Sequence, residues 1–339
     1  MKKEVFKFSN QSTEIYFNAG FPRLTNLVDR KSTVIITDEN VFRHHGRKFK
    51  GWDVIVLKPG EEYKIQETVD SVIGQLIKFE ADRKTFLVGI GGGVITDITG
   101  YVASVYMRGL RFGFVPTSIL AMVDASIGGK NGIDVGPYKN LVGTIHQPSF
   151  LFYDTAFLQS LPDSEWVNGF AEIIKHSCIK DPKMFKELEK NEIGHYRKDK
   201  KALDELIRRN VLIKLKVVKE DEFEKGERRL LNFGHTLGHA IENIYELSHG
   251  QAISIGMVVA CRISEKLAGF ADTERLKAVL EKYGLPVEAK YDRKKAFGIL
   301  KMDKKRAGKE MNYVLLKKIG FGLVEAIPMK ELEKLLLNI

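Results

Sequence analysis

Cysteine is scarce in this sequence, and long apolar runs are missing. The 339 residues include only Cys178 and Cys261, which lie in apolar segments without the paired spacing of metal-binding cysteines. So few cysteines exclude a disulfide-stapled fold and favour a reducing compartment, for which we expect the cytoplasm. No apolar run reaches the length of a membrane span, and the first residues lack the apolar core of a signal peptide. We therefore expect no membrane association.

Negative charge is in deficit, because 54 lysines and arginines face 44 aspartates and glutamates and leave a net charge of +10. Such a positive net charge is typical of a protein that binds a nucleic acid or an anionic small molecule, or of an organism whose proteins are rich in lysine. The lysines are scattered along the amphipathic segments 182–225 and 273–309, and aromatic residues are not interleaved with them as base stacking requires. We therefore expect no nucleic-acid partner.

The first part of the chain alternates between strand-like and helix-like segments. Thr85–Ile90 is an apolar run, and Gln66–Phe79 carries apolar residues at a helical spacing. Strands that alternate with helices favour a parallel sheet, and 339 residues fit about two domains. The sequence therefore predicts an α/β fold, with a Rossmann-like domain over residues 1–155. An all-helical domain follows over residues 156–339, with Asn312–Leu316 as its strand-like segment.

A glycine turn follows the apolar run and opens a helical segment. In Gly91-Gly92-Gly93 the missing side chains let the backbone approach a pyrophosphate, and a helix N-terminus supplies N–H donors and a favourable dipole. The pattern is not the usual G-x-G-x-x-G, and such turns also occur without a ligand. Asp38-Glu39-Asn40 and Pro59–Lys64 also follow predicted strands, where they suit either a dinucleotide or an ordinary surface turn.

Three of the eight histidines, His235, His239 and His249, fall within fifteen residues. His235 and His239 are four apart, which places both rings on one helical face. With a carboxylate from elsewhere they suit a divalent cation such as zinc. Glu172 is the candidate carboxylate, although its spacing from Lys175 equally suits an ion pair within a helix.

Charged and polar residues elsewhere suit an anionic substrate. Asp124 and Lys130 are separated by small residues, so that both can face a cavity, and Lys139-Asn140 follows closely. Guanidinium and ammonium groups bind phosphate or carboxylate, and each such residue alone also fits a solvated surface. The cations in question are Arg108, Lys214 and Arg228.

Several long motifs, in this order, resemble the 3-dehydroquinate synthases of the sugar-phosphate cyclase group. The matching segments are Gly91–Asp97, Tyr106–Gly109, Pro116–Asp134, Lys139–Gly143 with Gln147-Pro148, Ala171–Lys175, Asp221–Glu242 and His249-Gly250. The resemblance implies an N-terminal NAD-binding domain, a C-terminal helical domain, a site between them and a homodimer.

The resemblance also implies a role for each site residue. The metal ligands would be Glu172, His235 and His249, holding Zn²⁺ or Co²⁺, so that His239 would contact substrate instead of metal. The residues expected around the substrate are Asp124, Lys130, Asn140, Lys175, Lys214, Arg228, Asn232 and His239, with Arg108 from the partner subunit and one lysine of Asp303-Lys304-Lys305, for which Lys304 is the candidate. The residues expected around NAD are Asp38, Asn40, Glu61, Lys64, Gly92, Gly93, Asp97, Thr117, Ser118, Lys130 and Lys139.

The reaction implied by the resemblance converts 3-deoxy-D-arabino-heptulosonate 7-phosphate, a phosphorylated sugar acid, to 3-dehydroquinate and phosphate in the shikimate pathway. It is a carbon–oxygen lyase reaction in which NAD is reduced and reoxidised in each turnover. Gln251, Ser118 and Thr144-Ile145-His146 depart from the family pattern and leave open which cyclic product is made. The alternatives are another sugar-phosphate cyclase and a metal- and NAD-dependent polyol dehydrogenase of the glycerol dehydrogenase type, which would release NADH stoichiometrically.

Overall fold

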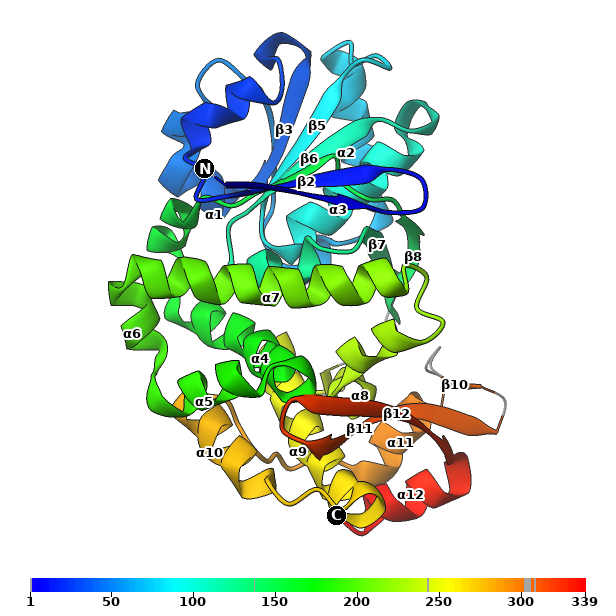
Figure 1. Cartoon of the computed structure of the whole chain (residues 1–339). Helices are drawn as coiled ribbons and strands as arrows, with labels where there is room; N and C mark the ends of the chain where they lie inside the picture. Colours follow the sequence, from blue (N-terminus) through cyan, green and yellow to red (C-terminus); the bar gives the residue numbers. More distant parts are fainter. Residues whose placement is uncertain (1, 137, 243, 302–305, 308) are drawn as a thin grey trace. The chain divides into compact units, whose positions relative to one another are not determined.

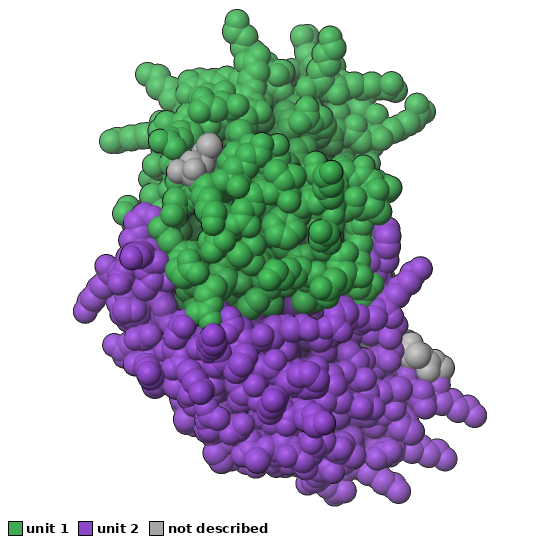
Figure 2. Space-filling view, viewed as in Figure 1, with its two compact units in different colours: residues 1–165, 204–222 green, residues 166–203, 223–339 purple. Residues whose placement is uncertain are grey.

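A computed structural model describes the chain except for residues 1, 137, 243, 302–305 and 308 (Figure 1). The chain forms two compact units (Figure 2). Unit 1 comprises residues 1–165 and 204–222, and unit 2 comprises residues 166–203 and 223–339. Helix α7, Lys200–Glu220, lies mostly in unit 1 although it follows the expected boundary at residue 155.

A twisted sheet forms the centre of unit 1. In the described part of the chain it has seven strands in the order β1-β2-β9-β6-β5-β3-β4. Its strands are β1 (Lys2–Lys7), β2 (Ser12–Phe17), β3 (Thr33–Asp38), β4 (Asp53–Leu57), β5 (Phe86–Gly91), β6 (Arg111–Pro116) and β9 (Phe150–Phe152). The β1–β2 pair is antiparallel, and the other pairs are parallel. The predicted parallel sheet is confirmed.

The central strands β3 and β5 are buried along their whole length. This burial explains their continuous apolar sequence, because a parallel strand covered on both faces has no solvent-facing side. The helical segments of unit 1 besides α7 are η1 (Phe21–Asn26), η2 (Arg30–Ser32), α1 (Glu39–His45), η3 (Gly46–Phe49), η4 (Glu61–Tyr63), α2 (Gln66–Lys78), α3 (Gly93–Val105), η5 (Tyr106–Arg108), the π-helical turn η6 (Ala121–Ala125) and η7 (Thr155–Ser160).

A hairpin of β7 (Lys130–Val135) and β8 (Tyr138–Ile145) packs against α3. Thr144 of β8 and His146, the residue after β8, both contact Ser104 of α3. The Thr144 hydroxyl donates to the Ser104 Oγ over 2.9 Å, and His146 Nδ1 lies 3.2 Å from the same oxygen. The segment that departs from the family pattern thus anchors the hairpin to the helix.

Unit 2 is largely helical. Its helices are α4 (Asp163–Lys180), α5 (Pro182–Lys190), α6 (Ile193–Lys198), η8 (Glu227–Asn232), α8 (His235–Glu242), α9 (His249–Ala268), α10 (Thr273–Lys282), α11 (Arg293–Leu300) and α12 (Met329–Leu337). An antiparallel sheet of β10 (Arg306–Ala307), β11 (Glu310–Lys318) and β12 (Phe321–Pro328) packs on α9. The strand-like segment Asn312–Leu316 lies in β11, so this unit is not purely helical. Among the described residues, no helix is both long and apolar enough to cross a membrane.

Candidate metal centre and nucleotide site

The side chain of Glu172, on α4, is completely buried in unit 2. Its Oε2 forms an ion pair with Lys175, one turn further along the same helix and also buried. Burial alone would raise the pKa of Glu172, but Lys175 and His235 outweigh it and hold this pKa well below its ordinary value. The carboxylate is therefore ionised and available as a ligand.

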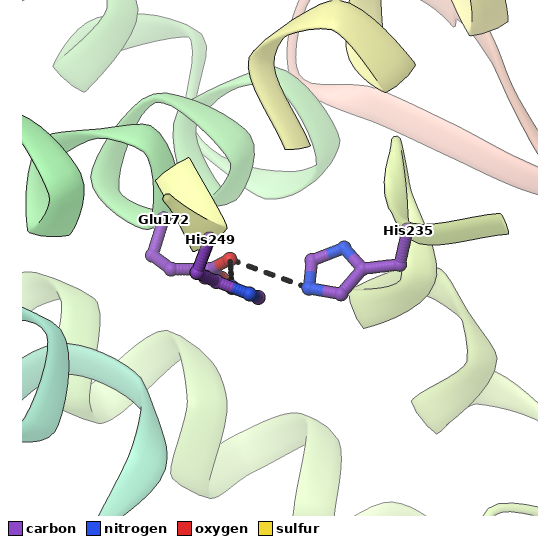
Figure 3. Close-up of side chains that lie close together, drawn as sticks. All are labelled: Glu172, His235 and His249. Carbon is purple, nitrogen blue, oxygen red and sulfur yellow. Dashed lines mark hydrogen bonds and ion pairs between the residues drawn. The ribbon is translucent and has the colours of Figure 1, made fainter. Parts of the chain in front are cut away.

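Two imidazoles face the other oxygen of this carboxylate (Figure 3). Nε2 of His235 lies 3.3 Å from Glu172 Oε1, and Nε2 of His249 lies 3.2 Å from it. A zinc ion with bonds of about 2.0–2.1 Å in tetrahedral geometry separates its donor atoms by roughly 3.3 Å. These two distances match that separation, and two nitrogen donors with one carboxylate oxygen are a ligand set that zinc uses.

The protonation of the two rings differs. Burial, followed by the nearby charge of Lys175, lowers the pKa of His235, so this ring is neutral and can offer a lone pair. For His249 burial acts in the same direction, but its contacts with Glu172 and Glu242 outweigh burial and raise the pKa to about 10. Without an ion the His249 ring is therefore protonated, and a metal that binds its Nε2 would replace one of its protons.

Close packing of α8 and α9 brings the two histidines together. A Cβ on Gly256 of α9 would lie 1.9 Å from the carbonyl oxygen of Gly234, the residue before α8. Similarly, a Cβ on Gly250 would lie 2.5 Å from the carbonyl oxygen of Asn168 on α4. Glycine at both positions therefore allows α9 to approach the segments that carry the other two ligands.

The first residue of α9 is His249, and a capping box fixes this helix start. The Ser248 hydroxyl accepts from the Gln251 N–H, and the Gln251 side chain accepts from the Ser248 N–H over 2.9 Å. Gln251 thus satisfies the N-cap although it departs from the family pattern, since glutamine and glutamate both complete such a box.

Three other expected substrate residues of unit 2 lie close in sequence to His235. Arg228 and Asn232 are on η8, and His239 is on α8. Arg228 is buried on η8, and the Asn232 amide donates to Glu224 over 2.6 Å. The His239 ring centroid lies 5.1 Å from that of His235. Lys304, the remaining candidate, lies outside the described residues.

In unit 1, Lys214 of α7 forms an ion pair with Asp124 of the π-helical turn η6. The Lys214 ammonium lies 2.8 Å from Asp124 Oδ1 and also donates to the Asp124 carbonyl over 2.7 Å. Lys130 and Asn140 lie on the β7–β8 hairpin, where the Asn140 N–H donates to Asp134 over 2.6 Å. Arg108 ends η5 with a φ of +66°.

The expected NAD residues of unit 1 include a charged cluster around Lys64, which is buried. Its ammonium lies 2.9 Å from Glu61, 3.3 Å from Asp97 and 3.9 Å from Asp134. Burial raises the pKa of Asp97 to about 6, against the opposing effect of Lys64. Burial would lower the pKa of Lys64, but the carboxylates outweigh it and raise this pKa. The sequence predicts no role for Asp134, and its only signal there is its place at the end of the matching segment Pro116–Asp134.

The remaining NAD candidates lie at the carboxyl ends of neighbouring strands, where α/β sheets bind nucleotides. Asp38 ends β3 and Gly92 follows β5, and these strands are paired. Asp38 also caps α1 by accepting from the Val41 N–H over 2.9 Å. The other members are Asn40 on α1, Gly93 at the start of α3, Thr117 and Ser118 just after β6, and Lys130 and Lys139 on the hairpin.

Solved structures similar to this chain define its class. A 2-epi-5-epi-valiolone synthase from Streptomyces hygroscopicus, with NAD⁺ and Zn²⁺ bound, is 27% identical with a TM-score of 0.86 over 99% of this chain and 98% of that one. A 2-deoxy-scyllo-inosose synthase complexed with carbaglucose-6-phosphate, NAD⁺ and Co²⁺ is 26% identical, with a TM-score of 0.85 over 99% of both chains. The fold is that of the sugar-phosphate cyclases.

Sequence comparisons identify the family within this class. The family model described as 3-dehydroquinate synthase N-terminal matches residues 54–168, and the one described as 3-dehydroquinate synthase C-terminal matches residues 169–306. A 3-dehydroquinate synthase from Pyrococcus abyssi is 41% identical over 293 residues, which is 85% of each chain. The chain belongs to the 3-dehydroquinate synthase family.

Proposed function

We propose that this protein converts 3-deoxy-D-arabino-heptulosonate 7-phosphate to 3-dehydroquinate and phosphate, as a carbon–oxygen lyase of the shikimate pathway. The observation that carries the proposal is the convergence of Glu172, His235 and His249 on one point in a chain of this family. Relatives named 3-dehydroquinate synthase are 35–44% identical to the chain, against 26–27% for the two cyclases with other products. This difference favours 3-dehydroquinate as the product.

The cofactors proposed are NAD and a Zn²⁺ or Co²⁺ ion, as in the two similar cyclase structures. The ion would act as a Lewis acid towards substrate hydroxyl groups, and NAD would accept a hydride and later return it. Glu172, His235 and His249 would hold the ion, and three protein ligands leave a coordination position open. Unit 1 would bind NAD through the glycine turn and the Lys64 cluster.

The cationic side chains would bind the carboxylate and phosphate of the substrate. Buried cations suit this role, because charge-assisted hydrogen bonds to an anion are strong where water is excluded. Of these cations, Arg228 is 2% exposed, Lys175 1% and Lys214 7%. The full set proposed to contact substrate is Arg108, Asp124, Lys130, Asn140, Lys175, Lys214, Arg228, Asn232, His239 and Lys304.

A stoichiometry measurement tests this function. The zinc-loaded protein is incubated with the heptulosonate phosphate and with NAD⁺ at a small fraction of the substrate concentration, while phosphate and NADH are followed. The cyclase reaction releases phosphate equal to the substrate without net NADH, since each hydride is returned. Accumulating NADH, or no phosphate, would contradict the proposal. Removal of zinc with a chelator and its re-addition provide the control.

We also propose that the protein is a cytoplasmic homodimer in which Arg108 serves the partner's substrate site. Exposed apolar side chains next to Arg108 in the sequence and on the β7–β8 hairpin support this proposal, because exposed apolar surface is typical of interaction sites. Val105 and Met107 are 41% and 45% exposed, and Leu141 of the hairpin is 63% exposed. The buried, unpaired state of both cysteines fits a reducing compartment.

A further inference from the structure

A second buried carboxylate lies behind the candidate metal centre and has no role in the proposed reaction. Glu242 is the last residue of α8, and its side chain is 6% exposed. Its Oε2 lies 3.4 Å from Nδ1 of His249, whereas Glu172 lies at Nε2 of the same ring. The imidazole therefore stands between two carboxylates, one at each nitrogen.

The two nitrogens of a ligating imidazole have different requirements. A neutral ring carries one hydrogen, so a lone pair on Nε2 requires the hydrogen to sit on Nδ1, where it needs an acceptor. For His235 that acceptor is a backbone carbonyl, because its Nδ1 lies 3.0 Å from the Phe233 oxygen. For His249 the group at Nδ1 is the Glu242 carboxylate. A carboxylate also makes the ring a stronger donor to a metal.

We infer that Glu242 is a positioning residue of the metal centre: its carboxylate accepts the Nδ1 hydrogen of His249 and turns the Nε2 lone pair towards the ion. The inference rests on the proposed function, because it presumes an ion held by Glu172, His235 and His249. Without this acceptor the His249 ring is free to adopt the other tautomer, in which Nε2 carries the hydrogen and cannot bind a metal.

A competing arrangement uses the same residues. His239, Glu242 and His249 also form a group with metal-ligand spacing, in which Glu242 would itself bind an ion. An ion on that side would compete with the Nδ1 hydrogen of His249. The arrangement with Glu172 leaves that hydrogen in place and gives both carboxylates a partner, so we favour it.

Zinc affinity of full-length variants tests the inference, measured by competition with a chromophoric chelator after removal of bound metal. Glu242→Gln keeps an acceptor oxygen but loses the charge, and we expect about 10-fold weaker zinc binding. Glu242→Ala removes the acceptor, and we expect weakening of about 100-fold. The matched control is Glu246→Gln, which removes an exposed carboxylate four residues further on and should leave the affinity within about 2-fold.

The visible spectrum of the Co²⁺-loaded protein separates positioning from general destabilisation. Loss of the carboxylate behind His249 changes the ligand field, so the Co²⁺ bands of Glu242→Gln should shift, whereas a mere loss of packing lowers occupancy without shifting them. Wild-type affinity and an unshifted spectrum in Glu242→Gln would overturn the inference. The inference would also be overturned if the wild-type chain bound two zinc ions and the Glu242→Ala chain bound one, because Glu242 would then be a ligand of the second ion. If the wild-type protein binds no zinc, the metal centre itself is wrong.

Discussion

His235 has a single proposed task, metal binding, and its replacement separates the metal from the nucleotide. His235→Ala removes one of three ligands, and we expect at least about 100-fold weaker zinc binding and loss of turnover. NAD⁺ affinity should change less than about 2-fold, because the proposed NAD residues all lie in unit 1. Metal analysis after dialysis and a fluorescence titration with NAD⁺ measure the two quantities. One zinc retained per chain would refute this ligand.

Asp97 gives a prediction on pH. Folded Asp97 keeps its proton to about pH 6, whereas an unfolded carboxyl loses it near pH 4. Between these values the folded state binds more protons, so the stability from this group falls as pH rises from about 4 to 6 and stays low above. A shift of about two units corresponds to about 3 kcal/mol at most.

Asp97→Asn has no such ionisation. Its free energy of unfolding relative to wild type should therefore rise by up to about 3 kcal/mol between pH 4 and pH 8, in the absence of NAD. Chemical denaturation at the two pH values measures the difference. Asp53→Asn, which removes an exposed carboxylate of the same unit, is the control. An unchanged or falling difference for Asp97→Asn would be inconsistent with the raised pKa.

Residue types and their spacing predict that the site binds a metal, but they do not predict how its residues are arranged in space. Residue types and spacing predict a metal site among His235, His239 and His249 with Glu172 as the candidate carboxylate, and only the resemblance moves His239 from the metal to the substrate. The structure brings Glu172, His235 and His249 together. Glu242 was missed because its partner, His249, comes from another helix, and no periodicity records a contact across two helices.

At the scale of elements, the approach of α9 to α8 controls the metal centre. Gly256→Ala places a methyl group against the Gly234 carbonyl, so the helices must separate. We expect a loss of about 1–3 kcal/mol in stability and at least about 10-fold weaker zinc binding. Gly298→Ala on α11 is the control, since its Cβ meets nothing within 4 Å and should stabilise by up to about 1 kcal/mol. Equal zinc affinities would show that the close approach is unimportant.

Elements with strong periodicity were predictable, and those defined by long-range packing were not. The expected helix Gln66–Phe79 corresponds to α2, and the apolar run Thr85–Ile90 corresponds to β5. The sequence predicts the sheet of unit 2 only at Asn312–Leu316, because β10 has two residues and the mostly half-exposed β12 has no regular alternation of buried and exposed positions. The placement of most of α7 in unit 1 depends on what that helix packs against, which its amphipathic pattern does not specify.

At the scale of the whole molecule, the proposed dimer predicts complementation between two inactive variants. If Arg108 acts in the partner's site, an Arg108→Ala chain keeps its metal ligands and receives an intact Arg108 from a His235→Ala partner. Each mixed dimer then has one complete site and one incomplete site. Because about half of the dimers in an equal, re-associated mixture are mixed, the mixture should recover roughly a quarter of wild-type turnover. Each variant alone is the control. No recovery in verified mixed dimers would place Arg108 in its own subunit's site.

The position of the bound metal is the most direct test of the proposed centre of Glu172, His235 and His249. Crystals of the zinc-loaded protein, measured on both sides of the zinc absorption edge, locate the ion by its anomalous scattering. We predict one strong peak per chain, about 2.0–2.2 Å from Glu172 Oε1 and from the Nε2 atoms of His235 and His249. A peak between His239, Glu242 and Nδ1 of His249, or no peak in this group of helices, would contradict this metal centre.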